Sequence, residues 1–241
     1  MCGRFALTLP VDRLRELFGF RQLPNLTERW NIAPTQAVLA VRQEPDGPAA
    51  FPARWGLIPS WSKDPSIGAK LINARAETVR EKPSFKTAFQ RRRCLIPADS
   101  FYEWKTLHGI KQPYRIRFED DGPFAFAGLW ERWLGADGSD VDTCSIVTTD
   151  ANEILSPLHH RMPVILDSNG FQTWLTGPQN DAADLMRPYQ GPRRLTYYPI
   201  SRKLNDVRND DASVWEEAPL PMEPEPAAQP KKLADDQLSL F

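Results

Sequence analysis

The second residue of the chain is a cysteine, where it can do chemistry that an internal cysteine cannot. A small second residue normally permits removal of the initiator methionine, so we expect Cys2 to become the N-terminus and to carry an amine and a thiol together. The amine would have a pKa of about 8 and the thiol one of about 8.5. Such a pair can condense with an aldehyde and close a thiazolidine ring, or act as an N-terminal nucleophile toward a carbonyl carbon. From position alone, an incidental cysteine at an ordinary terminus is the alternative.

A second polar cluster begins at Asn73, which alternates with apolar residues together with Arg75 and Glu77. Alternation of this kind predicts an extended segment with one polar face. On that face, Asn73 can hold a substrate hydroxyl or orient a nucleophile, and Arg75 can bind a phosphate through its planar guanidinium group. A surface strand with a turn-capping asparagine is the alternative.

Glu103 stands among large aromatic residues in Phe101-Tyr102-Glu103-Trp104. Apolar surroundings raise the pKa of a carboxyl group because they disfavour its charged form. Glu103 is therefore a candidate general acid and base. The alternative is a glutamate that points outward from an otherwise buried strand.

Two of the three histidines, His159 and His160, precede Arg161 and a strand-like apolar run at 163–166. A histidine beside an arginine indicates a proton shuttle next to a phosphate-binding group. Adjacent histidines point in different directions, so we expect at most one of the two rings to enter a site. A solvent-exposed loop histidine is the alternative.

Tryptophans and arginines recur in a combination that suits base stacking and phosphate neutralisation along single-stranded nucleic acid. We expect Trp61 to be exposed, because the surrounding stretch is turn-like. Cys94 and Cys144 lie in apolar, strand-like runs, which predicts inert core thiols. The chain contains neither a Gly-rich phosphate loop nor a metal-ligand spacing, so we expect no cofactor and no metal. The tryptophans and arginines concerned are Trp30, Trp55, Trp61, Trp104, Arg4, Arg29, Arg54 and Arg75.

Short β-like runs separated by Gly, Pro and Asp clusters make up most of the chain. Near its start, Val11, Leu14 and Phe18 have helical spacing between Pro10 and Gly19, which predicts a helix. Because no regular βαβ repeat follows, we expect an α+β fold: a single domain around a mainly antiparallel, barrel-like β-sheet with peripheral helices. The expected strands cover 37–41, 101–104, 114–118, 124–129 and 143–148, and the further helices 84–92, 152–158, 171–175 and 182–186.

The 241 residues, 41% of them apolar, suffice for one sizeable core. Neither a signal peptide nor an apolar run long enough to cross a bilayer is present, so we expect a cytoplasmic protein. Six acidic and two basic residues give 216–241 a net charge of −4, which leaves about +3 for the rest of a chain of net charge −1. That excess is compatible with a local phosphate-binding groove. We expect a folded domain over 1–215, a disordered, acidic, Pro-rich linker over 216–236 and a terminal motif at 237–241.

Several motifs, in this order, resemble those of the SOS-response-associated peptidase (SRAP) family, which includes abasic-site shield proteins of bacteria and vertebrates. The resemblance implies that Cys2 forms a thiazolidine crosslink with the ring-opened aldehyde of an abasic deoxyribose in single-stranded DNA, which shields the lesion during replication and the SOS response. The motifs are Met1-Cys2-Gly3-Arg4-Phe5, Trp30-Asn31-Ile32-Ala33-Pro34, Trp55-Gly56-Leu57-Ile58-Pro59, Ile72-Asn73-Ala74-Arg75-Ala76-Glu77, Arg93-Cys94-Leu95-Ile96-Pro97, Phe101-Tyr102-Glu103-Trp104 and His159-His160-Arg161-Met162-Pro163.

The same resemblance implies roles for the residues at matching positions. Glu103 would shuttle protons while the Schiff base forms, Asn73 would position the opened sugar, and His159 would protonate its hydroxyl or assist reversal. The family often has two aromatic residues where this chain has Trp61-Ser62, so the resemblance supports only one of the two stacking contacts here. The DNA-binding residues implied are Arg4, Asn31, Pro34, Trp61, Arg75 and Arg161.

The last five residues resemble the short peptide by which bacterial polymerases and repair proteins bind the replicative sliding clamp. Apolar side chains at the end can fill an apolar pocket, and the glutamine can supply a directional hydrogen bond. We therefore expect two partners, abasic single-stranded DNA and the clamp, for a nucleoid-associated monomer. The motif consists of Gln237, Leu238, Leu240 and Phe241.

Two other functions fit the same residues. A thiol autopeptidase would use Cys2 to attack a peptide carbonyl in its own leader, although only Met1 precedes Cys2 here. A non-covalent single-strand binding module would leave Cys2 incidental. Covalent capture of abasic DNA, with or without β-elimination at the lesion, distinguishes the crosslinking protein from both.

Overall fold

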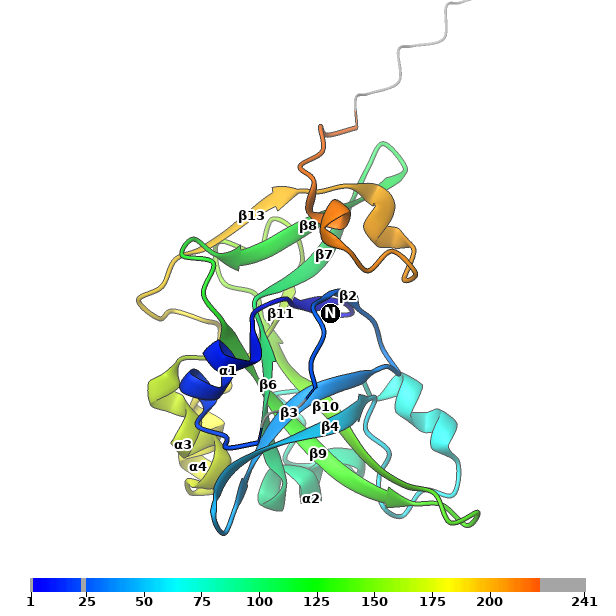
Figure 1. Ribbon diagram of the computed structural model, residues 1–241, viewed down its shortest axis with the longest axis vertical. Helices are drawn as coiled ribbons and strands as arrows, with labels where there is room; N and C mark the ends of the chain where they lie inside the picture. Colours follow the sequence, from blue (N-terminus) through cyan, green and yellow to red (C-terminus); the bar gives the residue numbers. More distant parts are fainter. Residues whose placement is uncertain (1, 23–24, 222–241) are drawn as a thin grey trace, which may run out of the picture.

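The computed structural model describes residues 2–22 and 25–221, and five of its strands close into a β-barrel (Figure 1). Antiparallel pairings join β4 to β3, β3 to β6, β6 to β9 and β9 to β10, and a parallel pairing of β10 with β4 closes the ring. The expected α+β fold around a mainly antiparallel, barrel-like sheet is confirmed. The barrel strands are β3 (Ala37–Glu44), β4 (Gly47–Trp55), β6 (Arg93–Ala98), β9 (Phe124–Leu134) and β10 (Asp140–Asp150).

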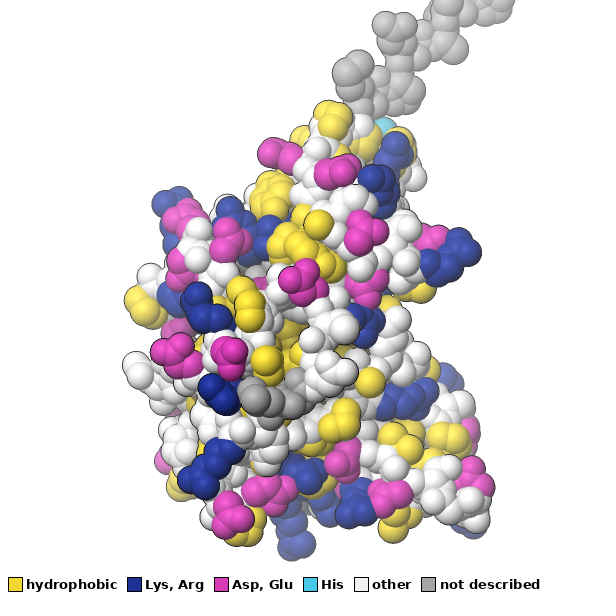
Figure 2. Space-filling view, in the orientation of Figure 1, with side chains coloured by type: hydrophobic (Ala, Val, Ile, Leu, Met, Phe, Trp, Pro, Cys, Tyr) yellow, Lys and Arg dark blue, Asp and Glu magenta, His cyan; other side chains and the backbone are white. Residues whose placement is uncertain are grey.

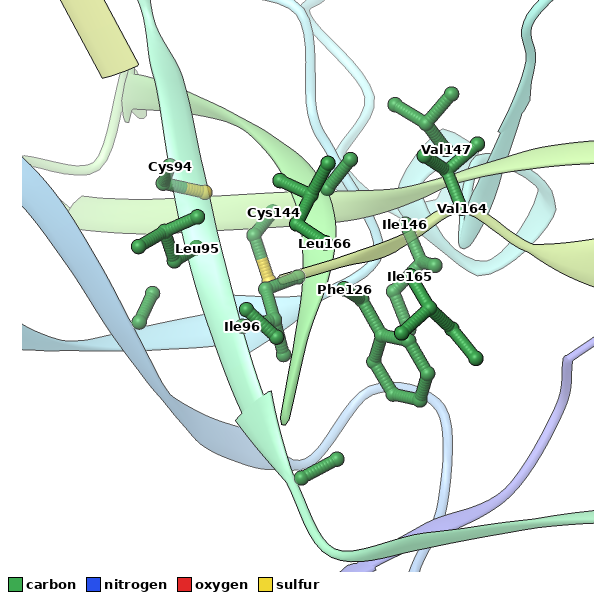
Figure 3. Packing of buried hydrophobic residues seen from close by; sticks show 14 of the residues in the cluster. Cys94, Leu95, Ile96, Phe126, Cys144, Ile146, Val147, Val164, Ile165 and Leu166 are labelled. Atoms are coloured by element: carbon green, nitrogen blue, oxygen red, sulfur yellow. The ribbon is translucent and has the colours of Figure 1, made fainter. Parts of the chain in front are cut away.

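The core of the barrel is apolar and densely packed (Figure 3). Cys94 and Cys144 are both completely buried in it, as expected for inert core thiols. Gly128 lies where β9 meets β6, and a Cβ atom there would come within 2.8 Å of Sγ of Cys94 and 2.9 Å of Cγ1 of Ile96. Glycine at this position therefore leaves room for the side chains of Cys94 and Ile96.

A second, five-stranded antiparallel sheet lies above the barrel in Figure 1 and has the order β13-β8-β7-β1-β2. Phe5 of β1 ties it to the barrel, because its ring packs edge-on against Trp55 and Phe126 at centroid distances of 5.2 and 5.6 Å. The start of the chain is thus held between the two sheets. The strands are β1 (Phe5–Leu7), β2 (Arg29–Ile32), β7 (Ser100–Leu107), β8 (Ile110–Phe118) and β13 (Leu195–Pro199).

Short elements extend the barrel sheet around β10. Strand β5 (Asn73–Arg75) runs parallel to β10, while β11 (Arg161–Pro163) pairs antiparallel with it, and β12 (Ile165–Leu166) pairs with β9. Three 3-10 helices complete the connections: η1 (Pro65–Lys70), η2 (Arg202–Asn205) and η3 (Ala212–Trp215).

Helices cover the outside of the barrel. The first, α1 (Val11–Phe18), buries Leu14 and Phe18 and ends at Gly19, whose φ of 72° is the left-handed conformation that glycine tolerates at a helix end. It lies beside α3 and α4 in Figure 1, with Phe18 stacked on Phe171 at 5.2 Å. The others are α2 (Pro83–Arg91), α3 (Ser168–Thr176) and α4 (Gln179–Asp184), each shifted by a few residues from its predicted range.

One predicted helix does not form. Residues 152–158 make only turns, with the amide of Ser156 donating to the carbonyl of Asn152 at 2.9 Å. Pro157 follows and has no amide hydrogen, so the ladder of helical hydrogen bonds cannot continue through it. The apolar spacing in this stretch instead buries Leu155 from a turn.

The folded part extends slightly into the predicted linker. The amide of Ala218 donates to the carbonyl of Pro199 at 3.1 Å, and the carbonyl of Glu216 accepts from Ser201 at 2.8 Å. Residues 222–236 of the predicted linker and the clamp motif at 237–241 lie outside the described residues. Among the described helices, none is both long and apolar enough to cross a membrane.

Candidate active site around Cys2

Cys2 lies just before β1 and is completely buried. Its Sγ contacts the carbonyl oxygen of Arg4 at 3.8 Å. Burial raises the pKa of the Cys2 thiol, and the negative charge of Glu103 raises this pKa further. The resting sulfur is therefore a protonated thiol, which needs a base before it can act as a nucleophile.

Asn73 holds the backbone of Cys2 in place. Its Nδ2 donates a hydrogen bond of 2.8 Å to the carbonyl oxygen of Cys2, and the parallel pairing of β5 with β10 sets its position opposite Ile146. Its Oδ1 is buried and has no hydrogen-bond partner within residues 2–22 and 25–221. A buried acceptor without a hydrogen-bond partner destabilises the folded state by about 1–3 kcal/mol. This oxygen is therefore suited to accept a hydrogen bond from a hydroxyl group of a bound molecule.

Glu103 reaches the same place from β7. Strand β1 pairs with β7 through Phe5 and Phe101, and the amide of Tyr102 donates to the carbonyl of Arg4 at 3.1 Å. Burial raises the pKa of the Glu103 carboxyl, while the positive charge of His160 acts to lower it. A carboxyl group with a raised pKa can both take up and return a proton, which suits a general acid and base.

His159 and His160 lie together instead of pointing in different directions. Their rings stack at a centroid distance of 4.4 Å and an interplanar angle of 25°. The rings can stack because the two residues lie in the loop between the turn at 153–158 and β11, not in a strand with alternating sides. Burial lowers the pKa of His159, so its imidazole is mainly neutral at physiological pH.

A pocket of about 530 Å³ opens beside these groups. Its wall includes Trp104, whose Nε1 donates to Oδ1 of Asn205 at 2.7 Å. The sequence analysis did not identify Thr106, Lys111 and Asn205 as site residues. Thr106 and Lys111 lie opposite each other in the β7–β8 hairpin, and the His108-Gly109 turn between them could have predicted this pairing. The lining residues are Arg4, Glu103, Trp104, Thr106, Lys111, His159 and Asn205.

Arg4 lines this pocket, but Asn31 does not. Nη1 of Arg4 donates to Oδ1 of Asn31 at 2.6 Å and to the carbonyl of Leu204 at 2.9 Å. Asn31 is completely buried, and its Nδ2 lies within 3.2 Å of three carbonyl oxygens in 204–209. The direct DNA contact expected of Asn31 does not fit this placement, since its side-chain amide is already hydrogen-bonded to protein atoms.

Arg161 is buried as well, with 8% of its side chain exposed. It makes a bidentate ion pair with Glu77, at 2.6 and 3.0 Å, and also binds Asp150 at 2.9 Å. Both terminal nitrogens of this guanidinium group are engaged and its Nε is buried, so it cannot hold a DNA phosphate without breaking these bonds or moving. In the described conformation, Arg161 is therefore a structural partner of the site and does not support the expected phosphate contact.

The remaining predicted DNA-binding residues lie outside the pocket. Trp61 is 61% exposed, as expected, and Arg75 is exposed on β5. Pro34 is half-buried in the turn between β2 and β3. On the face shown in Figure 2, Lys and Arg side chains are interspersed with Asp and Glu side chains. Within the described residues, no cluster of His, Cys, Asp and Glu is arranged to hold a metal ion.

Comparison with known proteins agrees with the motifs in the sequence. The abasic site processing protein YoqW of Bacillus subtilis (strain 168) is 42% identical over 224 residues, which cover 90% of this chain and 99% of that protein. The abasic site processing protein HMCES of Gallus gallus is 33% identical over 257 residues, covering 87% of this chain and 76% of that protein.

Solved structures and family models extend the agreement. A crystal structure of a protein from Bacteroides thetaiotaomicron has a TM-score of 0.80 to this fold at 27% identity, covering 90% of this chain and 100% of the other. The model of the family described as SOS response associated peptidase (SRAP) matches residues 1–207. With most of the chain matched, including every element that surrounds Cys2, this protein belongs to the SRAP family.

Proposed function

We propose that this protein processes abasic sites in single-stranded DNA by forming a thiazolidine crosslink to the ring-opened sugar through Cys2, once Met1 has been removed. The observation that carries the proposal is the placement of Cys2, whose carbonyl is held by Asn73 and whose thiol lies close to Glu103. The names of the bacterial and vertebrate relatives, abasic site processing proteins, support the choice of lesion. The crosslink shields the lesion in the nucleoid during replication and the SOS response.

The reaction balances without a cofactor. The α-amine of Cys2 adds to the aldehyde carbon and gives a carbinolamine, which loses its hydroxyl group as water to form a protonated Schiff base. Sγ then adds to the same carbon and closes the five-membered ring, while the thiol proton passes to a base. One water is released for each crosslink and no electrons are transferred.

Proton transfer is the role we assign to Glu103. The thiol is protonated at rest because burial raises its pKa, so ring closure requires a nearby group that accepts the proton. Glu103 can take that proton, and in its protonated form it can deliver one to the departing carbinolamine hydroxyl. Asn73 supports these steps by fixing the Cys2 backbone and offering its buried Oδ1 to a sugar hydroxyl.

A denaturing gel with abasic single-stranded DNA tests the proposal. The wild-type protein should give a covalent band of lower mobility, whereas Cys2→Ala should give none and still bind undamaged DNA in a native gel. A variant that retains an extra N-terminal residue should also fail, because an acylated nitrogen cannot enter the ring. Equal crosslinking by Cys2→Ala would overturn the proposal, and undiminished crosslinking by the extended variant would indicate a simple thiol adduct.

We further propose that His159 protonates the sugar side of the crosslink and assists its reversal. It lines the pocket beside Glu103, and its lowered pKa keeps a neutral ring available for proton exchange. His159→Ala should slow release more than formation, measured by a chase with competing abasic DNA after the crosslink has formed. Unchanged release would remove His159 from this role.

The DNA path that we propose uses residues around the pocket. Arg4 lines the pocket and reaches it with its guanidinium group, while Arg75 and Trp61 are exposed for phosphate contact and base stacking. Pro34 would contribute an apolar surface from the turn after β2. We also propose that the terminal motif at 237–241 binds the replicative sliding clamp, since its apolar residues follow an acidic, Pro-rich stretch that can serve as a tether.

A further inference from the structure

His159 has an unusual partner for one of its ring nitrogens. Nδ1 lies 2.9 Å from the amide nitrogen of Arg161 and 3.1 Å from the carbonyl oxygen of the same residue. When Nδ1 is unprotonated it accepts a hydrogen bond from the N–H, and when it is protonated it donates one to the C=O. The ring therefore finds a partner in both states without rotating. Because Nδ1 faces the backbone, Nε2 is the nitrogen that can exchange a proton with a substrate.

This double contact depends on where the backbone of Arg161 lies. Residue 161 pairs with Asp150 at the end of β10, and the Arg161 side chain is held there by Asp150, by the carbonyl of Thr148 at 2.7 Å and by both carboxylate oxygens of Glu77. Glu77 comes from the turn after β5, the strand that also carries Asn73. The Glu77–Arg161 ion pair thus connects the segment that holds Cys2 to the segment that holds His159.

We propose that Glu77 is a positioning residue for His159: through its bidentate ion pair with Arg161, it fixes the backbone N–H and C=O between which Nδ1 sits. The inference deepens the proposed function, because it says which residue determines the protonation of His159. Only its kinetic part rests on the proposed function. At rest the shorter contact to the N–H selects the neutral tautomer with the proton on Nε2. When Nδ1 takes up a proton, the ring becomes an imidazolium whose Nδ1–H donates to the C=O of Arg161. Transfer of the Nε2 proton to a sugar oxygen then leaves a neutral ring with its proton on Nδ1, and the ring does not have to turn.

Other charged and titratable groups also face this histidine. His160 stacks on its ring, Arg161 lies next to it, and Glu103 and Arg4 line the same pocket. Glu77 differs from these groups because it acts on His159 indirectly, through its ion pair with Arg161. Removing its charge should change the behaviour of His159 while the pocket-lining residues keep their places.

The primary test is nuclear magnetic resonance of the imidazole nitrogens, which are few because the chain has three histidines. In the wild-type protein, Nδ1 of His159 should be unprotonated and Nε2 protonated, with a pKa below the ordinary value. In Glu77→Gln the ring should show a mixture of tautomers and a pKa that is lower still, because a carboxylate no longer compensates the positive charge of Arg161. Glu77→Asp, which keeps the charge, should behave more like the wild type, and Glu81→Gln, an exposed neighbour in the next turn, should change nothing. The same tautomer and pKa in Glu77→Gln would overturn the inference.

Crosslink kinetics supply the second measurement. Release from Glu77→Gln should slow by roughly tenfold, less than the factor of about 100 or more that a general acid contributes, because Glu77 only positions His159. The pH profile of release should move with the His159 pKa. If Glu77→Gln does not fold, Asp150→Asn removes a single contact of the same guanidinium group and should shift the tautomer in the same direction. If the wild-type protein forms no crosslink, the proposed function fails, while the resonance measurement still decides the role of Glu77.

Discussion

Replacing Asn31 by alanine would test whether this buried side chain builds the wall of the pocket. Its Nδ2 lies 3.2 Å from the carbonyl oxygen of Leu204, 3.0 Å from that of Asp206 and 2.8 Å from that of Asn209, and its Oδ1 accepts from Arg4 at 2.6 Å. The single amide therefore ties β2 to the loop after η2 and to the residue that lines the pocket. Alanine would break all of these contacts at once.

The loss of stability follows from counting those bonds. An NH2 group has two hydrogens, so the three carbonyls share about two full hydrogen bonds, each worth about 1 kcal/mol net, and the bond from Arg4 adds about 1.5–3 kcal/mol because its donor is charged. We expect Asn31→Ala to lower the free energy of unfolding by about 4 kcal/mol. In a domain of this size, each kcal/mol corresponds to about 2–4 °C, so Tm should fall by about 10 °C.

Thermal and urea denaturation measure this change, and hydrogen exchange locates it. Amides of 204–209 should exchange faster in the variant, because their carbonyls no longer anchor the loop. Asn180→Ala is the matched control: it removes an exposed asparagine that only accepts from Arg80, and it should change stability by less than about 0.5 kcal/mol. A loss in Asn31→Ala no larger than in the control, or unchanged exchange in the loop, would refute the reasoning.

Three further outcomes are expected. Glu103→Gln should slow crosslink formation by about 100-fold or more. The pKa of Glu103 is raised in the folded state, so ionisation of this carboxyl group destabilises the folded state as the pH rises above about 4.3. The variant should therefore have a higher Tm than the wild type near pH 7 and the same Tm in acid. Lys111→Gln should weaken binding to undamaged single-stranded DNA. Fluorescence anisotropy at several salt concentrations should show that the slope of log K against log salt concentration becomes smaller in magnitude by about 0.7. An unchanged slope would indicate that Lys111 does not contact a phosphate. A peptide of residues 232–241 should bind the replicative sliding clamp with a Kd in the micromolar range, about −8 kcal/mol, and lose that binding when Leu240 and Phe241 are replaced by alanine; crosslinking by the full chain carrying the same double substitution should be unchanged.

Local patterns in the sequence predicted the four described helices and a part of the strands. Helix α1 follows from apolar spacing between Pro10 and Gly19, and five strands were recognisable from short apolar runs between turn residues. These signals are local: they depend on backbone preferences and on which side chains share one face. The same signals failed at 152–158, where one proline outweighs helical spacing. The parallel closure of β4 on β10 had no local signal, because it joins segments that are far apart along the chain.

The chemistry of the site divides in a similar way. By itself, the sequence determined which groups are present and pointed to Cys2, Asn73, Glu103 and His159, since residue type and motif order identify a nucleophile, an amide, a carboxylate and an imidazole. Only the tertiary structure decided how each group is used. It buries the thiol and the carboxyl together, so that their pKa values rise, and it stacks the two histidine rings.

The clearest contrast is in the residues that were expected to bind DNA directly. Asn31 and Arg161 have side chains suited to a phosphate or a base, but the fold surrounds each of them with protein partners. For Asn31, Arg4 lies 27 residues away along the chain and the three carbonyl partners lie 173 to 178 residues away. Whether a polar side chain contacts solvent, a ligand or another part of the protein depends on contacts between distant segments. The local sequence around the side chain does not indicate these contacts.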